Sequence, residues 1–176
     1  LCSIGTACMF VGEPTTREGI SFRSIHIDEI FIAENADGIV DTVFRIFKMT
    51  VRQIVQKWGE KSLSPRIQRM YEKKEFDKEV ELFHCVYPRD DDKGKKAATM
   101  LPVASVYIDE KEKHVLAEGG FDEMPYMVGR WSKTVGEVFG RSPAMTALPD
   151  IKMLQEIMKT TIKAAQKVVD PPLLVP

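Results

Sequence analysis

Charged side chains recur at helical spacing near the end of this 176-residue chain. At about 100° per residue, a helix would place Lys152, Glu156, Lys159, Lys163 and Lys167 in one narrow stripe. A row of amines can bind the phosphates of nucleic acid, but amphipathic helices also carry lysine simply to stay hydrated. The spacing therefore makes the four lysines a candidate cationic surface and leaves a solvated face as the alternative.

The opposite side of the same segment is apolar. Its members are Leu154, Ile157, Met158, Ile162, Ala165, Val168 and Val169. Asp150 precedes the pattern and Asp170-Pro171-Pro172 ends it, which predicts a long amphipathic helix over about 150–169. Little chain remains to cover so wide an apolar face, so we expect it to pack on the rest of the chain or on adjacent copies.

Residue pairs that could perform catalysis are poorly placed for it. His84 and Cys85 could form a thiol–imidazole pair, but neighbours on a strand point to opposite faces and cannot share a hydrogen bond. The carboxylates of Asp109-Glu110 and of Asp90 to Asp92 are predicted in hydrophilic loops, where nothing would raise their pKa. We therefore expect no catalytic residues.

Signals for a nucleotide, a metal or a stacking site are equally weak. Gly119-Gly120 is followed by Phe121-Asp122, without the lysine of a phosphate-binding loop. The three histidines, His26, His84 and His114, fall in different strand-like segments, and the three cysteines lack zinc or disulfide spacing. We expect no cofactor, no metal and free thiols. Arg130-Trp131 could stack or bind phosphate, but a core position for the tryptophan is the favoured interpretation.

Composition limits the class of protein. The net charge is -1 and 44% of the residues are hydrophobic, which is typical of one globular domain or two small ones. No run reaches the ~18 apolar residues of a membrane span, so we expect a soluble, unexported chain. Because the chain starts without methionine and ends in an apolar run, we expect a piece of a longer polypeptide.

The elements that must position these residues follow from periodicity and turn chemistry. Helices are predicted after Thr50, ending at Gly59, and from Ser64-Pro65 to about Tyr71. Strands are predicted at about 8–11, 20–27, 29–33, 40–48, 80–87, 102–108, 114–118 and 126–131. The fold class is therefore α+β, with mostly antiparallel strands and short helices followed by the long C-terminal amphipathic helix.

Several phrases, in order, resemble one known family. They are Asp37 to Thr50, Arg52-Gln53, Trp58-Gly59, Arg130-Trp131, Gly136 to Pro143, Ala147 to Lys152 and Val169 to Leu173. Together they resemble the head-to-tail connecting (portal) proteins of short-tailed bacteriophages. The stretch 60–123 matches only loosely.

The resemblance implies a structural subunit rather than an enzyme. Portals form a ring, usually a dodecamer, at one capsid vertex, and conduct double-stranded DNA without sequence specificity. It implies terminase, capsid and tail proteins as partners, no membrane, and a place in the virion after assembly in the bacterial host cytoplasm. Residues 1–141 would form an α+β wing, 142–170 a stem helix and 171–176 the lead into a missing clip.

The resemblance also implies that Lys152, Lys159, Lys163 and Lys167 face the DNA channel and that the apolar face packs in the stem. Two alternatives stay open. One is a hydrolase-type enzyme with a site among the loops Asp90 to Lys96 and Gly119 to Met124, and the other is a phage adaptor without a channel.

Overall fold

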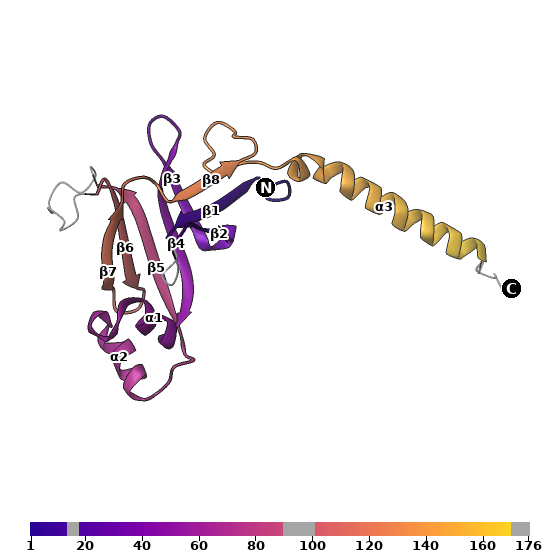
Figure 1. Ribbon diagram of the computed structural model, residues 1–176. Helices are drawn as coiled ribbons and strands as arrows, with labels where there is room; N and C mark the ends of the chain where they lie inside the picture. The colour runs from indigo at the N-terminus through magenta and orange to yellow at the C-terminus, as the bar shows by residue number, and fades with distance from the viewer. Residues whose placement is uncertain (14–17, 90–100, 170–176) are drawn as a thin grey trace. The chain divides into compact units, whose positions relative to one another are not determined.

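The computed structural model describes residues 1–13, 18–89 and 101–169, and Figure 1 shows its ribbon. The chain divides into two compact units, Ala7–Gly129 and a second one that combines Leu1–Thr6 with Arg130–Pro176. Antiparallel sheets with short helices are followed by one long helix (Figure 1), which confirms the α+β fold class.

A small antiparallel hairpin opens the fold. The three strands of its sheet are β1 (Thr6–Gly12), β2 (Ser21–Ile25) and β8 (Tyr126–Arg130), in the order β2-β1-β8. β1 and β2 are antiparallel, with Cys8 opposite Ile25 and Gly12 opposite Ser21. This register confirms the hairpin that the sequence predicts across 8–27.

The larger sheet is a five-stranded antiparallel meander. Its strands are β3 (Ile30–Glu34), β4 (Val40–Thr50), β5 (Glu79–Pro88), β6 (Val103–Asp109) and β7 (His114–Phe121), paired in chain order. Along β5, the side chains of Val80, Leu82, His84 and Val86 are buried while those between them are more exposed. The period of two thus gives the sheet one inner face.

Two short helices interrupt the meander between β4 and β5. They are α1 (Val51–Trp58) and α2 (Pro65–Glu72), and two 3-10 turns, η1 (Ile27–Glu29) and η2 (Glu60–Ser62), precede β3 and α2. Thr50 caps α1 through a reciprocal box with Gln53, and Gly59 ends the helix at φ 77°. Ser64 caps α2, so both helices begin where the sequence predicts.

The hydrophobic core of this unit lies where the two helices cover the sheet. Its buried members are Val51, Ile54, Leu63, Ile67, Val80, Leu82 and Leu116. Full burial of each large aliphatic side chain contributes about 1.5–3 kcal/mol. The unit Ala7–Gly129 therefore has a core of its own.

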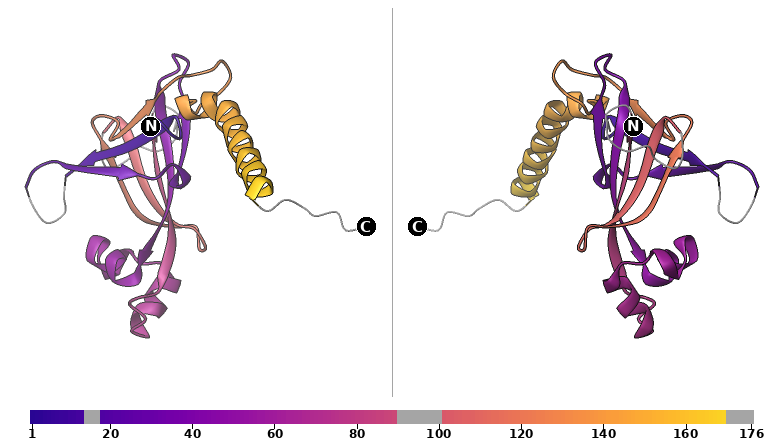
Figure 2. Two further views of the ribbon diagram at one scale, coloured as in Figure 1. Left: turned by 90° about the vertical axis from the view of Figure 1, so that its right-hand side faces the viewer. Right: turned by 90° about the vertical axis from the view of Figure 1, so that its left-hand side faces the viewer.

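The second unit carries the long helix α3 (Pro143–Val169). The helix begins before the predicted start at Asp150. Ser142 Oγ accepts a hydrogen bond from the amide of Met145 at 3.0 Å, and Pro143 takes the first helical position, where a missing N–H is tolerated. Pro149 lies inside the helix, so the helix extends through this proline towards the N-terminus. The first turns of α3 run in a different direction from the rest (Figure 2), as expected near an internal proline.

Candidate functional site

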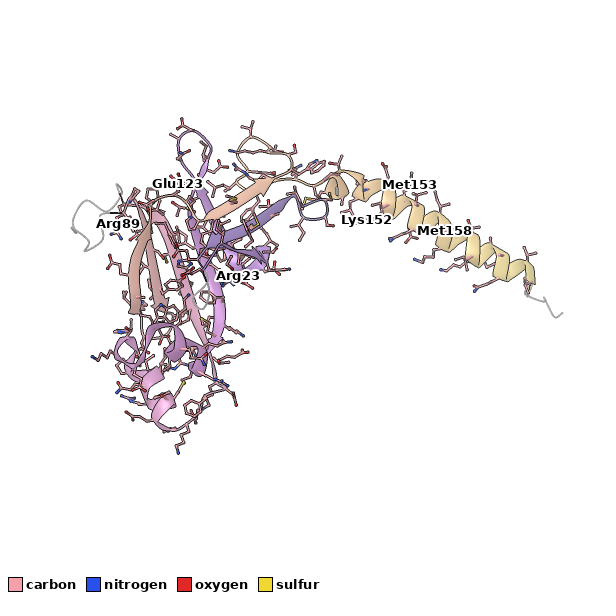
Figure 3. All side chains as sticks on the ribbon, viewed as in Figure 1. Arg23, Arg89, Glu123, Lys152, Met153 and Met158 are labelled. Atoms are coloured by element: carbon pink, nitrogen blue, oxygen red, sulfur yellow. The ribbon has the colours of Figure 1, made fainter. Side chains whose placement is uncertain are left out.

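The candidate lysines all lie within one continuous helix. Lys152, Lys159, Lys163 and Lys167 are exposed on α3, which is uninterrupted from Pro143 to Val169. Figure 3 labels Lys152, Met153 and Met158, whose side chains project outward from the helix. The helical spacing therefore does place the four ammonium groups on one side of a single rod.

One acidic residue moderates this stripe. Glu156 pairs with Lys159, with Nζ and Oε1 3.2 Å apart, and both side chains are solvent exposed. Exposed pairs of this kind contribute about 0.3–0.5 kcal/mol and are screened by salt. Within residues 1–13, 18–89 and 101–169, no carboxylate lies within 4.0 Å of the ammonium groups of Lys152, Lys163 or Lys167. The stripe keeps a net positive charge.

The apolar face of α3 is uncovered by the described part of the chain. No residue of the helix is buried, and Leu154 and Ile157 are 58% and 53% exposed. The remaining members, Met158, Ile162, Ala165, Val168 and Val169, are exposed as well. A helix gains most of its stability from packing its apolar face, so α3 presents a surface that lacks its packing partner.

The start of α3 is held by a clasp between the first residues and the segment before the helix. The amide of Gly140 donates to Thr6 Oγ1 at 2.8 Å, and Ser142 Oγ donates to the carbonyl of Ser3 at 2.9 Å. Gly5 adopts φ 84°, and a Cβ there would overlap the carbonyl of Gly140. We call residues 1–6 with 130–142 the clasp.

His84 has a structural setting rather than a nucleophilic one. It lies 2% exposed on the inner face of β5, whereas Cys85 lies on the other face, as the strand period predicts. His84 Nδ1 is 2.7 Å from the hydroxyl of Tyr126 and its Nε2 is 2.9 Å from Ser105 Oγ. Burial, followed by the nearby charges of Lys57 and Arg45, lowers its pKa to about 3.

That arrangement does not support catalysis. A histidine with so low a pKa is neutral and weakly basic near pH 7. Ser105, its hydroxyl partner, is buried. Sequence reasoning missed the partners Ser105 and Tyr126, because only the strand register brings them to His84.

The predicted loop position of Asp109 is wrong. Asp109 ends β6, fully buried, and its Oδ2 accepts a hydrogen bond from Ser64 Oγ at 2.7 Å. Oδ1 accepts the amide of Lys111 and lies 3.9 Å from the guanidinium of Arg66. The carboxylate thus fixes the cap of α2 and the following turn. Asp90 to Asp92 fall outside the described residues.

Two further expectations need correction. Gly119-Gly120 lies inside β7 rather than in a loop, and the Gly119 carbonyl accepts a hydrogen bond from Arg89 Nη2 at 2.7 Å. Trp131 is 55% exposed, so it is not a core residue, and Arg130 donates to the carbonyl of Val138 at 3.2 Å. The strand ends before the tryptophan, which removes the alternation that predicted burial.

Two loops are the alternative location for an enzyme site. Of the two, Asp90 to Lys96 lies outside the described residues, and Gly119 to Met124 contains the end of β7 and the turn after it. In the parts of the chain that the structure describes, no three His, Cys, Asp or Glu side chains are grouped to hold a metal ion. None of the described helices has the length and hydropathy to cross a membrane.

A cavity between the two sheets has no counterpart among the sequence motifs. Its volume is about 720 Å³, and Arg23, Arg45 and Lys57 line it together with His84 and Tyr107. These residues come from β2, β4, α1, β5 and β6. We call this space the intersheet cavity.

Comparison with known proteins gives one consistent result. A family model described as bacteriophage head to tail connecting protein matches residues 1–176. The portal protein of Salmonella phage epsilon15 is 34% identical over 180 residues, and the probable portal protein of Bordetella phage BPP-1 is 30% identical over 179 residues. Both alignments cover 100% of this chain and 32% of the relative, so the chain spans about a third of the length of these curated relatives.

Proposed function

The chain belongs to the bacteriophage head to tail connecting protein family, and on this premise we propose that it is part of a portal subunit in a ring that conducts double-stranded DNA. The ring would join the head to the tail at the capsid vertex. In this role the chain is a structural component and not an enzyme.

One observation carries the proposal most directly, namely the uncovered apolar face of α3. None of the helix is buried, although Leu154, Ile157, Met158 and Ile162 form a broad hydrophobic surface. Large exposed apolar faces mark interaction surfaces. In a closed ring, the same helix from neighbouring copies supplies the missing cover, since heterologous contacts repeat around the axis.

The lysine stripe supports a channel-facing role for the side of α3 opposite the apolar face. Repeated around a ring, Lys152, Lys159, Lys163 and Lys167 would form belts of positive charge facing phosphates. Contacts of this kind are independent of base sequence and weaken with salt. Glu156, which pairs with Lys159, lowers the charge of the belt, which favours passage of DNA over tight binding.

The partners follow from the same proposal. We infer a ring of identical subunits, of which twelve is the expected number, with terminase, capsid and tail proteins as its contacts. The proposed location is the portal vertex of the virion, reached after assembly in the bacterial cytoplasm. We assign residues 1–141 to a wing, 142–170 to the stem and 171–176 to the approach to a clip.

The decisive experiment uses the full-length subunit. Electron microscopy is expected to show a closed ring with a central hole wide enough for duplex DNA. The variant Lys159→Gln/Lys163→Gln/Lys167→Gln is expected to assemble normally and to change DNA packaging or retention, more strongly at low salt.

A matched control removes three charges elsewhere. Lys61, Lys73 and Lys111 are exposed on the unit Ala7–Gly129, and their triple change to glutamine should leave packaging unchanged. Wild-type packaging and retention by the α3 variant at both low and physiological salt would reduce the stripe to a solvated face. A full-length protein without a channel would favour the adaptor alternative.

A further inference from the structure

The intersheet cavity is open, and its lining combines apolar and cationic groups. Phe10 and Phe121 from the small and the large sheet line it, as do Phe47 and Met49 of β4. A volume of about 720 Å³ lies within the range of roughly 300–1,000 Å³ that small-molecule sites occupy. All residues of its lining belong to the unit Ala7–Gly129, so nothing in this inference depends on α3.

Three cations around the cavity each lie over an aromatic ring. The Arg45 guanidinium is 4.5 Å from the centroid of Phe47, and the Lys57 ammonium is 4.3 Å from that of Tyr107. Arg23, labelled in Figure 3, projects from β2 with its guanidinium 5.8 Å from the Phe10 centroid. The rings hold the cations in place while leaving their N–H groups available to an acceptor.

Only one of these cations has a carboxylate partner among the residues that the structure describes. Arg45 makes a two-point contact with Glu29, at 2.8 Å from Nε and 2.7 Å from Nη2. Arg23 and Lys57 have no carboxylate within 4.0 Å in that part of the chain, although Glu13 and Asp122 also line the cavity.

Among the described residues, the positive charge of Lys57 therefore has no adjacent carboxylate to balance it. Lys57 is exposed as a residue, but its ammonium lies against the rings of Trp58 and Tyr107. Desolvation, followed by the charges of Arg23 and Arg45, lowers the pKa of Lys57 to about 8. A bound anion would offset this repulsion.

The buried groups beside the cavity supply no negative charge. The hydroxyl of Tyr126 lies 2.7 Å from Nδ1 of His84, which is neutral near pH 7. Burial raises the pKa of the Tyr126 hydroxyl, so it remains protonated. His84 and Tyr126 therefore contribute neutral, hydrogen-bonded groups to the lining.

We propose that the intersheet cavity binds a small amphiphilic anion, with a carboxylate or phosphate head at Arg23 and Lys57 and an apolar body against the aromatic walls. The two cations would bind the anionic head, and the aromatic walls would bind the apolar body. An amine of the same length lacks the attraction to the cations, and a small hydrophilic anion lacks the apolar contact.

The test is isothermal titration calorimetry of the chain with octanoate and, in parallel, octylammonium at pH 7. Octanoate is expected to bind with a Kd below about 1 mM and octylammonium at least about tenfold more weakly. Lys57→Met and Arg23→Gln should each weaken octanoate binding about tenfold, the loss expected for one charge-assisted contact. Lys57→Arg should retain binding, because it keeps the charge.

The controls separate the cavity from other apolar surfaces. Replacing exposed Lys61 of η2 (Lys61→Gln) should leave octanoate affinity unchanged, as should Lys159→Gln on α3. Nitrogen-15 NMR of the Lys57 ammonium should show a higher pKa at saturating octanoate. If Lys57→Met does not fold, exposed Arg23→Gln decides the matter.

Three results would overturn the proposal. They are equal binding of octanoate and octylammonium, full octanoate affinity in folded Lys57→Met and Arg23→Gln, and no octanoate binding up to about 10 mM. None of these bears on the ring, since the packaging experiment alters only α3.

Discussion

Two isoleucines in helices show how differently two regions of this chain are built. Ile54 of α1 is 0% exposed in the core between the helices and the sheet, whereas Ile157 of α3 is 53% exposed. Both helices are amphipathic, but only the first meets its packing partner within the described chain. Amphipathic patterning thus predicts that an apolar face packs against something, but it does not predict whether the partner belongs to the same chain.

The largest expected effect separates these two isoleucines directly. Ile54→Ala should lower the free energy of unfolding by about 2–5 kcal/mol, because it leaves a cavity in a dry core. Ile157→Ala should change it by no more than about 0.5 kcal/mol, since the residue is exposed and alanine is a good helix former. Urea unfolding followed by circular dichroism checks both.

The same comparison between Ile54 and Ile157 can be made in the full-length ring. There, Ile157→Ala should reduce ring assembly, as measured by sedimentation velocity, because the apolar face packs on neighbouring copies. An Ile157→Ala variant that destabilises this chain as much as Ile54→Ala would show that α3 packs internally, and the contrast between the regions would fail.

Low pH should also destabilise the unit Ala7–Gly129, because His84 lies in its interior. Its folded pKa of about 3 lies below the usual 6.5, so the unfolded state binds the proton more readily between these values. The stabilisation is complete above about pH 6.5 and falls by about 1.4 kcal/mol per pH unit below it, or about 2 kcal/mol by pH 5. Urea melts at pH 7 and 5 measure this loss.

Two variants isolate the histidine responsible. His84→Gln should flatten the difference between pH 7 and 5, whereas exposed His114→Gln should leave it in place. An unchanged acid loss in His84→Gln would assign it to other groups.

The clasp gives a third comparison, between two glycines with the same φ of 84°. At Gly136 a Cβ would have nothing within 4 Å, so Gly136→Ala should cost only the left-handed strain of about 1–2 kcal/mol. At Gly5 the Cβ would also overlap the Gly140 backbone, which adds roughly 1–3 kcal/mol.

Hydrogen exchange of the Trp131 amide reports this difference, because that amide donates to the Gly5 carbonyl at 2.8 Å. Exchange should be faster in Gly5→Ala than in Gly136→Ala. Equal exchange rates in the two variants would mean that the clasp accommodates a Cβ at Gly5 without loss of stability.

A smaller effect is expected at the cap of α3. Ser142→Ala removes the acceptor for the Met145 amide and the bond to the Ser3 carbonyl, and should cost about 1 kcal/mol. Amide exchange in the first turn of α3 should speed up by about fivefold. Ser132→Ala, an exposed serine outside the helix, serves as the control and should change nothing.

Local elements are predictable because local chemistry decides them. The cap at Thr50, the Ser64-Pro65 start of α2 and the hairpins around β1 and β6 all follow from residues within a few positions of one another. The end of α3 follows in the same way, but its start does not. A proline at position 149 favours a break, and the helix instead begins at the Ser142 cap, which is itself bonded to distant Ser3.

The sequence by itself determined the two faces of α3, since helical period alone sets which residues share a side. Tertiary structure decided everything that depends on register between distant strands. Tertiary structure placed Asp109 in a buried hydrogen bond with Ser64 and brought Tyr126 and Ser105 to His84. It also placed Arg23, Arg45 and Lys57 around one cavity. These residues lie far apart along the chain, and single-sequence patterns carry no information on which strands pair or where side chains from two sheets meet.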